Sequence, residues 1–296
     1  LASNIEITLE ANPDDLTPEK LATFYDNGIN RLSIGIQSFN DENLKWMNRQ
    51  HSGQEAIDAV LNARQAGFEN ISVDLIYAVP YEDHSIWEAD LKQAIRLRPE
   101  HISSYCLTIE PKTAFGKWVE KGQMLEIDED FAADQFEILL ETMYKYGYDQ
   151  YEISNFAQPG YESRHNSSYW KDEKYLGIGP SAHSYNGKFR KANVSNNAKY
   201  IKGLDEGVIP FEVIMLSKED QINEYILTSL RTKWGCSLEL LKEKYGVDLL
   251  MKHRDYLNKI SLQDLIYEDE GHLILTDSGK LLADKLASDL FVEADD

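Results

Sequence analysis

The sequence predicts an α/β fold in which parallel strands alternate with helices, as in a barrel, followed by a smaller helical domain. Three short apolar segments with strand character, residues 6–10, 31–37 and 71–74, are separated by segments with helical character, and the third runs into Leu75-Ile-Tyr77. Strands that are joined through helices lie parallel in one sheet. Their C-terminal ends then share one face, where barrel enzymes keep their functional residues.

Cap signals mark the helices between these strands. They are Thr17-Pro18 before a helix that stops at Gly28, the capping box Ser52-x-x-Glu55 before a helix through Gln65, and a second box, Ser85-x-x-Glu88, before a helix that ends ahead of Pro99. We expect a strand over 101–108, an amphipathic helix over 129–146 and a strand over 151–154. A looser polar and aromatic stretch, 155–176, precedes a hairpin around Tyr185-Asn-Gly187.

The character of the chain changes near residue 212, so we expect two domains, residues 1–211 and 212–296. The second part alternates helical segments with a short strand at Leu273–Leu275, which is typical of a winged-helix-like domain. Such domains often bind DNA, but residues 211–296 hold 10 basic and 18 acidic side chains. That balance favours a structural or lid role over DNA binding.

Composition narrows the classes of partner. The chain has 296 residues and a formal net charge of −21, which disfavours nucleic acid and anionic membrane surfaces. Its two cysteines, Cys106 and Cys236, cannot build a disulfide framework or a cysteine metal cluster. We find no signal peptide and no run of about 18 apolar residues that could span a membrane. A cytoplasmic protein without an integral membrane segment is therefore expected.

Polar residues stand at the ends of the first three predicted strands. Glu10, Gln37 and Asp74 each follow apolar strand residues, and Arg49 lies on the segment after the second strand. Two carboxylates, an amide and a guanidinium suit a ligand that carries hydroxyl, amine and carboxylate groups. The same residues could instead cap helices or pair with Arg49 to stabilise the loops, and the pattern alone does not separate these readings.

A second polar and aromatic cluster contains His165, Asn166, Tyr169 and Trp170. The imidazole could ligate iron or donate a proton, and the rings could stack on a flat aromatic ligand. A packed aromatic loop whose histidine bonds the backbone explains the same pattern, and for an isolated cluster we favour that interpretation. His183, after a glycine-rich segment, is a further candidate or simply a turn histidine.

Six motifs in register give the sequence a specific resemblance. They are Glu6-Ile-Thr-Leu-Glu-Ala-Asn-Pro13, Asn30-Arg-Leu-Ser-Ile-Gly-Ile-Gln-Ser-Phe-Asn40, Asp74-Leu-Ile-Tyr77, Leu107-Thr-Ile-Glu-Pro111, Tyr151-Glu-Ile-Ser-Asn-Phe-Ala157 and His165-Asn-x-x-Tyr-Trp170. Together they resemble the HemW-type haem chaperones, relatives of oxygen-independent coproporphyrinogen III oxidase in the radical S-adenosylmethionine (SAM) superfamily. The resemblance covers essentially the whole chain.

The resemblance implies a partial, open (β/α)6 radical-SAM barrel with a [4Fe-4S] cluster and SAM at its mouth. It implies that SAM contacts Glu10, Gln37, Arg49 and Asp74, and that haem binds at His165, Asn166, Tyr169 and Trp170. The implied function is a haem-binding chaperone that transfers haem to acceptor proteins. The alternative is coproporphyrinogen III oxidase, which decarboxylates its substrate through a 5′-deoxyadenosyl radical.

The sequence departs from that family pattern at its start. It lacks the three-cysteine C-x-x-x-C-x-x-C loop and the G-G-G-T-P segment, both of which belong upstream of Glu6 in the family. We therefore expect that these residues hold no cluster, which belongs on an N-terminal segment absent from this sequence. We also expect an open sheet whose first strand is exposed, with Ile7 and Leu9 poorly covered.

Overall fold

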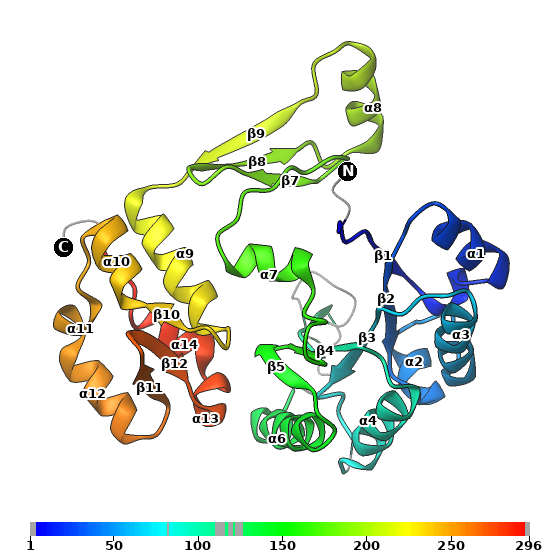
Figure 1. The fold of residues 1–296 in the computed structure, drawn as a ribbon, viewed down its shortest axis with the longest axis horizontal. Coiled ribbons are helices and arrows are strands. Elements are labelled where there is room, and N and C mark those ends of the chain that lie inside the picture. Colours follow the sequence, from blue (N-terminus) through cyan, green and yellow to red (C-terminus); the bar gives the residue numbers. More distant parts are fainter. Residues whose placement is uncertain (1–3, 82, 110–115, 118–120, 122–126, 294–296) are drawn as a thin grey trace. The chain divides into compact units, whose positions relative to one another are not determined.

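The computed structural model describes residues 4–81, 83–109, 116–117, 121 and 127–293. The chain forms two compact units, residues 1–163 and 164–296 (Figure 1). The predicted division into 1–211 and 212–296 stays a prediction. No described helix is both long enough and apolar enough to cross a membrane.

A six-stranded open sheet, in the order β1-β2-β3-β4-β6-β5, forms the centre of the first unit. Its strands are β1 (Thr8–Ala11), β2 (Arg31–Gln37), β3 (Ile71–Tyr77), β4 (His101–Cys106), β5 (Asp149–Glu152) and β6 (Asn155–Ala157). The first four strands pair in parallel, as predicted. The last two form an antiparallel hairpin, and β6 pairs antiparallel with β4. The expected open α/β barrel is confirmed, but β6 was not foreseen.

Strand β1 lies at one edge of this sheet and pairs only with β2 among the described strands. Ile7 and Leu9 are half-buried, and Leu9 packs on the margin of the core. The expected edge position of the first strand is therefore confirmed, but Ile7 and Leu9 are better covered than expected.

Five helices lie in the described residues of the sheet unit. They are α1 (Pro18–Asp26), α2 (Asp41–Trp46), α3 (Gly53–Gln65), α4 (Ser85–Leu97) and α6 (Glu129–Lys145), and a 3-10 turn, η1 (Pro13–Asp15), follows β1. Alternate strand residues such as Ile34 and Val73 are fully buried in one apolar core with residues of α3, α4 and α6. The opposite face of the strands is left for polar residues.

The cap signals explain where two of these helices start. The Thr17 hydroxyl accepts a hydrogen bond from the Lys20 amide, and Ser52 and Glu55 cap each other reciprocally. The box predicted at Ser85-x-x-Glu88 is wrong. Ser85 is the first helical residue, and both its amide and its hydroxyl donate to the Asp83 carboxylate instead.

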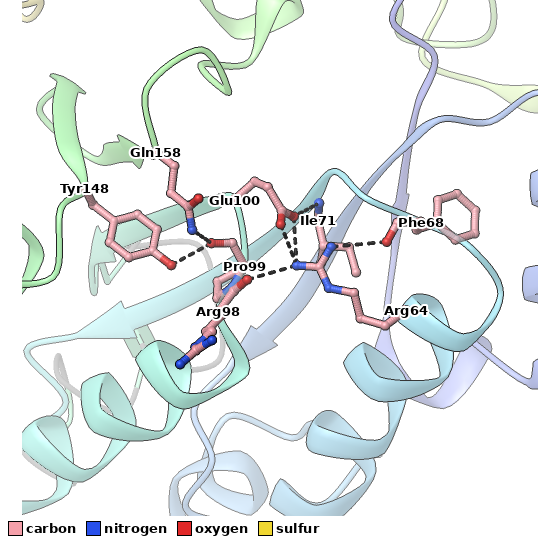
Figure 2. Close-up of polar contacts among 8 residues, drawn as sticks. All are labelled: Arg64, Phe68, Ile71, Arg98, Pro99, Glu100, Tyr148 and Gln158. Atoms are coloured by element: carbon pink, nitrogen blue, oxygen red, sulfur yellow. Dashed lines mark hydrogen bonds and ion pairs between the residues drawn. The ribbon is translucent and has the colours of Figure 1, made fainter.

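Arg64 connects residues at the N-terminal ends of β3 and β4, the ends opposite the predicted site (Figure 2). Its guanidinium donates to the carbonyl oxygens of Phe68 and Arg98, and Nη2 lies 2.8 Å from each carboxylate oxygen of Glu100. The Glu100 carboxylate also accepts from the amide of Ile71, the first residue of β3. The start of β3 and the loop before β4 are thereby held in register.

The second unit contains two small antiparallel sheets and eight helices in its described residues. The first part holds α7 (Arg164–Trp170), β7 (His183–Tyr185), β8 (Phe189–Asn193), α8 (Asn197–Asp205) and β9 (Phe211–Met215). The rest holds α9 (Lys218–Leu230), β10 (Cys236–Ser237), α10 (Leu238–Tyr245), α11 (Leu249–Lys252), α12 (Arg254–Leu262), β11 (Ile266–Asp269), β12 (His272–Leu275), α13 (Asp277–Lys280) and α14 (Ala283–Ser288). The predicted hairpin is β7–β8, and helices packed with the β10-β12-β11 sheet match the expected helical C-terminal region.

Candidate functional site

One face of the central sheet is polar across five neighbouring strands. Because side chains alternate between the two faces of a strand, residues in register across the sheet share a face. One row consists of Glu10, Ser33, Ser72 and His101, and the next contains Asp74, Ser103 and Asn155. The sheet therefore brings Glu10 and Asp74 to the same face. The prediction that Asp74 ends its strand is wrong, because β3 continues to Tyr77 and Asp74 is its middle residue.

Asp74 lies within this polar face. Ser33 Oγ lies 3.3 Å from each of its carboxylate oxygens. Burial raises the pKa of Asp74 to about 6, although hydrogen bonds from Ser103 and Ser33 and the charge of Arg31 act to lower it. The Glu10 carboxylate also raises this pKa by repulsion, so the two acids interact electrostatically.

Gln37 and Arg49 converge over Gly35 on the same side of β2. A Cβ atom added to Gly35 would stand 2.9 Å from Gln37 Nε2, 3.0 Å from Arg49 Nη2 and 3.8 Å from the carbonyl oxygen of Ala11. Arg49 Nη2 donates a 2.8 Å hydrogen bond to the Gly35 carbonyl oxygen. The structure thus gathers an amide and a guanidinium next to the end of β1, which carries Glu10.

Two further observations indicate that these residues are arranged for a ligand. Gln37 has a φ of 69°, a left-handed conformation that non-glycine residues rarely adopt and that often occurs at binding sites. Arg49 Nε is buried and has no hydrogen-bond partner among the described residues. Together with the carboxylates of Glu10 and Asp74, which can accept hydrogen bonds, these groups fit the carboxylate, ammonium and hydroxyl groups of the SAM that the resemblance implies.

A buried acid holds the loop that follows Gln37. The Asp90 carboxylate, on α4, accepts hydrogen bonds from Ser38 Oγ at 2.5 Å and from the Phe39 amide at 2.7 Å. Burial raises the pKa of Asp90 to about 6, against the effect of these two hydrogen bonds. The helix layer thus fixes the backbone directly after the predicted ligand residue Gln37.

Next to Asp74, the side chains of Ser72, His101 and Tyr151 form a hydrogen-bonded chain. His101 is fully buried and lies 2.7 Å from Ser72 Oγ through Nδ1 and 2.8 Å from the Tyr151 hydroxyl through Nε2. Burial, reinforced by the charge of Arg31, holds the pKa of His101 well below its usual value. The imidazole is therefore neutral at physiological pH, and it contributes hydrogen bonds rather than charge to the site.

The second predicted cluster lies on α7 in the other unit. His165 and Tyr169 are one turn apart, with Nε2 of the imidazole 3.1 Å from the Tyr169 hydroxyl and the rings edge to face. Asn166 and Trp170 form the next pair, in which the indole Nε1 donates to the amide oxygen at 3.1 Å. The motif spacing is therefore that of two i,i+4 pairs on one helix.

His165 is exposed, and Tyr169 is 40% exposed. The loop that we favoured for the isolated cluster is wrong, because these residues lie on a helix, where the His165 imidazole contacts the Tyr169 side chain. His183 lies apart from this helix in sequence, exposed on β7.

A metal centre does not arise from the described part of the chain. No three His, Cys, Asp or Glu side chains among those residues are grouped so that they could hold a metal ion. Cys106 is exposed in the first unit and Cys236 is buried in the second. These residues therefore do not fit a [4Fe-4S] cluster.

Several residues of the polar face were missed from the sequence. They are Arg31, Ser33, Gly35, Ser72, His101 and Ser103. The available signal was period-two alternation, since polar residues or glycine occupy every second place of Arg31-Leu-Ser-Ile-Gly-Ile-Gln37 and of His101-Ile-Ser103.

Comparisons with known proteins show the family of the chain. A sequence model of the radical SAM superfamily matches residues 1–94, and one of the HemN C-terminal domain matches residues 216–282. The heme chaperone HemW of Bacillus subtilis is 38% identical over 282 residues, which are 95% of this chain and 74% of that protein. HemW of Lactococcus lactis is 36% identical over 275 residues, 93% of this chain and 72% of that protein.

Solved structures give the same fold. Coproporphyrinogen III oxidase (HemN) from Escherichia coli superposes with a TM-score of 0.79 at 20% sequence identity, over 98% of this chain and 70% of that one. This likeness concerns the fold, while the identity to the two HemW proteins extends over most of both sequences. The chain therefore belongs to the HemW family of heme chaperones within the radical SAM superfamily.

Proposed function

We propose that this protein binds haem at α7 and passes it to haem-accepting proteins. The observation that carries the proposal is the exposed imidazole of His165, set against the Tyr169 ring on a short helix whose next pair is Asn166 and Trp170. An imidazole is a common axial ligand of haem iron, and aromatic rings supply stacking area for the macrocycle. The name of the relatives, heme chaperone, supports the same ligand.

The exposure of His165 suits a carrier better than a permanent haem protein. A chaperone has to release its cargo, so the iron ligand has to stay within reach of an acceptor. The Tyr169 hydroxyl lies 3.1 Å from Nε2, so haem iron that binds through this nitrogen has to displace the hydroxyl. The cost of that displacement favours reversible binding.

Titration of haem into the protein tests the proposal. Haem that binds to the wild type produces a Soret band with a defined endpoint. His165→Ala should weaken binding by about tenfold or more, because it removes the proposed iron ligand. His183→Ala is the matched control, an exposed histidine of the same unit that should leave the titration unchanged. A wild type that binds no haem would refute the proposal.

We further propose that Glu10, Gln37, Arg49 and Asp74 bind SAM. In this arrangement Arg49 takes the carboxylate of the ligand, and the two acids take its ammonium and hydroxyl groups. The radical SAM family uses SAM together with a [4Fe-4S] cluster. The described residues offer no ligand set for the cluster, so the function assigned to these four residues is binding alone.

The oxidase alternative has less support. Its structural representative shares the fold at 20% identity, and fold alone does not carry a reaction. The chaperone assignment rests instead on relatives that are 36% and 38% identical over more than nine-tenths of this chain.

A further inference from the structure

A small cavity in the first unit is lined by residues at the end of β3 and on α4. Its lining also includes the buried side chain of Asn43, on α2, and the half-buried side chain of Tyr81. The cavity has a volume of about 10 Å³, which is space for one particle of the size of a water molecule. None of the four residues proposed above to bind SAM is among the described residues that line it.

Asn43 lines this cavity and has an oxygen without a partner. The residue is only 3% exposed, and its side-chain oxygen Oδ1 is buried with no hydrogen-bond partner among the described residues. The amide nitrogen of the same side chain lies 3.4 Å from Ser38 Oγ, so Oδ1 is on the other side of the amide group. An unpaired buried acceptor is costly, so this atom indicates a ligand that the protein contacts there.

Asp90 adds a negative charge to the lining of the cavity. The residue is 3% exposed, and its carboxylate accepts hydrogen bonds from Ser38 Oγ and the Phe39 amide but forms no ion pair with a basic side chain in the described part of the chain. Its pKa of about 6 leaves it mostly ionised at pH 7.5. Buried charges in proteins are paired or bind metal ions, so this carboxylate requires a cation. Ser38 Oγ contacts both Asp90 and Asn43, which keeps the two side chains next to each other.

The other polar groups of the lining reinforce the negative character of the cavity. Burial and then the charges of Glu42 and Asp90 raise the pKa of Tyr81. The Gln135 side-chain oxygen accepts a hydrogen bond from a backbone amide, and the Asp83 carboxylate accepts the bonds that cap α4. These side chains therefore present acceptor oxygens and negative charge, which suit a cation and not an anion.

A singly charged ion matches this set best. Ca²⁺ takes about six to eight oxygen ligands and Mg²⁺ retains several waters, whereas the cavity holds only one particle of the size of water. A monovalent ion also needs fewer acids than the metal centre that the described residues cannot build. A water molecule alone would satisfy Asn43 Oδ1, but it would leave the charge of Asp90 unbalanced. Potassium and ammonium ions are close to water in size.

We propose that this cavity binds one monovalent cation of the size of potassium, held by the Asp90 carboxylate and the Asn43 amide oxygen. The same carboxylate bonds Ser38 and Phe39, the two residues that follow Gln37, so the ion helps to hold that loop. The inference goes beyond the functions proposed above and does not depend on SAM or haem binding.

Thermal unfolding of the protein at pH 7.5 in different chloride salts of equal concentration tests it. Relative to tetramethylammonium chloride, whose cation is too large for the cavity, potassium chloride should raise the unfolding midpoint of wild type by about 3 °C or more, and the rise should saturate with potassium concentration. Ammonium chloride should act as potassium chloride does. Asp90→Asn keeps the shape of the side chain and removes its charge, while Asn43→Leu removes the oxygen. Each variant should lose the difference between the salts.

Glu88→Gln is the matched control, because it removes an exposed acid of the same helix, α4, and should keep the full difference. Equal midpoints of wild type in potassium and tetramethylammonium chloride would overturn the inference. So would a difference that persists undiminished in Asp90→Asn and Asn43→Leu, or stabilisation by magnesium chloride but not by potassium chloride. None of these results depends on SAM or haem, so the proposals for those ligands are tested separately.

Discussion

The Arg49 guanidinium donates a 2.8 Å hydrogen bond to the carbonyl oxygen of Gly35, a residue in the middle of β2. This contact is direct because Gly35 has no side chain on the face where Gln37 and Arg49 meet. A glycine inside a strand weakens the strand, so its position here indicates a close approach that other residues need.

Gly35→Ala should therefore impair ligand binding more than stability. The added methyl group would lie 2.9 Å from Gln37 Nε2 and 3.0 Å from Arg49 Nη2, and both are ends of side chains that can move aside. We expect SAM to bind about tenfold more weakly by calorimetry, because the two ends leave the positions that the ligand requires. Ser104→Ala, at a position of β4 that alternates to the other face, is the control. Unchanged SAM affinity in Gly35→Ala would argue against this site.

Asp74 makes the stability of the fold depend on pH. Its pKa is about 6 in the folded protein and 3.8 in an unfolded chain, so between these values the folded state binds more protons. Stability should then fall as pH rises from about 4 to about 6, and this loss remains at neutral pH. Asp74→Asn removes the loss and should raise the free energy of unfolding by about 1–3 kcal/mol at pH 7.5, with little effect at pH 4.

Urea unfolding of wild type and Asp74→Asn at both pH values measures this difference. Asp90 also has a raised pKa, but it is present in both proteins and cancels in the comparison. The same substitution should weaken SAM binding, since the proposed site needs the carboxylate. A variant that is no more stable at pH 7.5 than wild type would mean that the hydrogen bonds from Ser33 and Ser103 outweigh the cost of burial.

The sequence predicted correctly those helices and strands that are determined by interactions between residues close in the chain. Strand 31–37 and the helix that ends at Gln65 were predicted at those residues, because alternation and a reciprocal cap act within a few positions. Strand β6 has only three residues and exists through pairing with β4 and β5, so nothing local indicated it. The capping box predicted at Ser85 does not form, because Asp83, two residues earlier, accepts the hydrogen bonds of the serine that the box required.

The candidate site likewise contains residues that the sequence predicted and contacts that it could not predict. Glu10 and Gln37 were found because strand ends can be read from the sequence. Asp74 was found although its predicted strand end is wrong, since β3 continues for three residues beyond it, and the parallel sheet brings it onto the face of Glu10. The supporting contacts could not be found, because the Ser33–Asp74 and His101–Tyr151 pairs depend on register and on residues 41 and 50 positions apart. Likewise, nothing in the sequence placed Asn43 and Asp90 at the same cavity.

The last prediction concerns Arg64, whose guanidinium joins three segments at the ends of β3 and β4 away from the site (Figure 2). Its side chain is 28% exposed and that of Glu100 is 14% exposed. Arg64→Ala would leave this partly buried carboxylate without its cation and two carbonyl oxygens without a donor. We expect a loss of about 2–3 kcal/mol in the free energy of unfolding.

Arg64→Lys separates charge from geometry in that network. A lysine keeps the positive charge, but its single ammonium group cannot reproduce the planar fork that spans Phe68, Arg98 and Glu100, so most of the loss should persist. Arg96→Ala, which removes an exposed arginine of α4, should change the unfolding free energy by less than about 0.5 kcal/mol. If Arg64→Lys were as stable as wild type, the ion pair alone would hold the start of β3, and the carbonyl contacts would contribute nothing measurable.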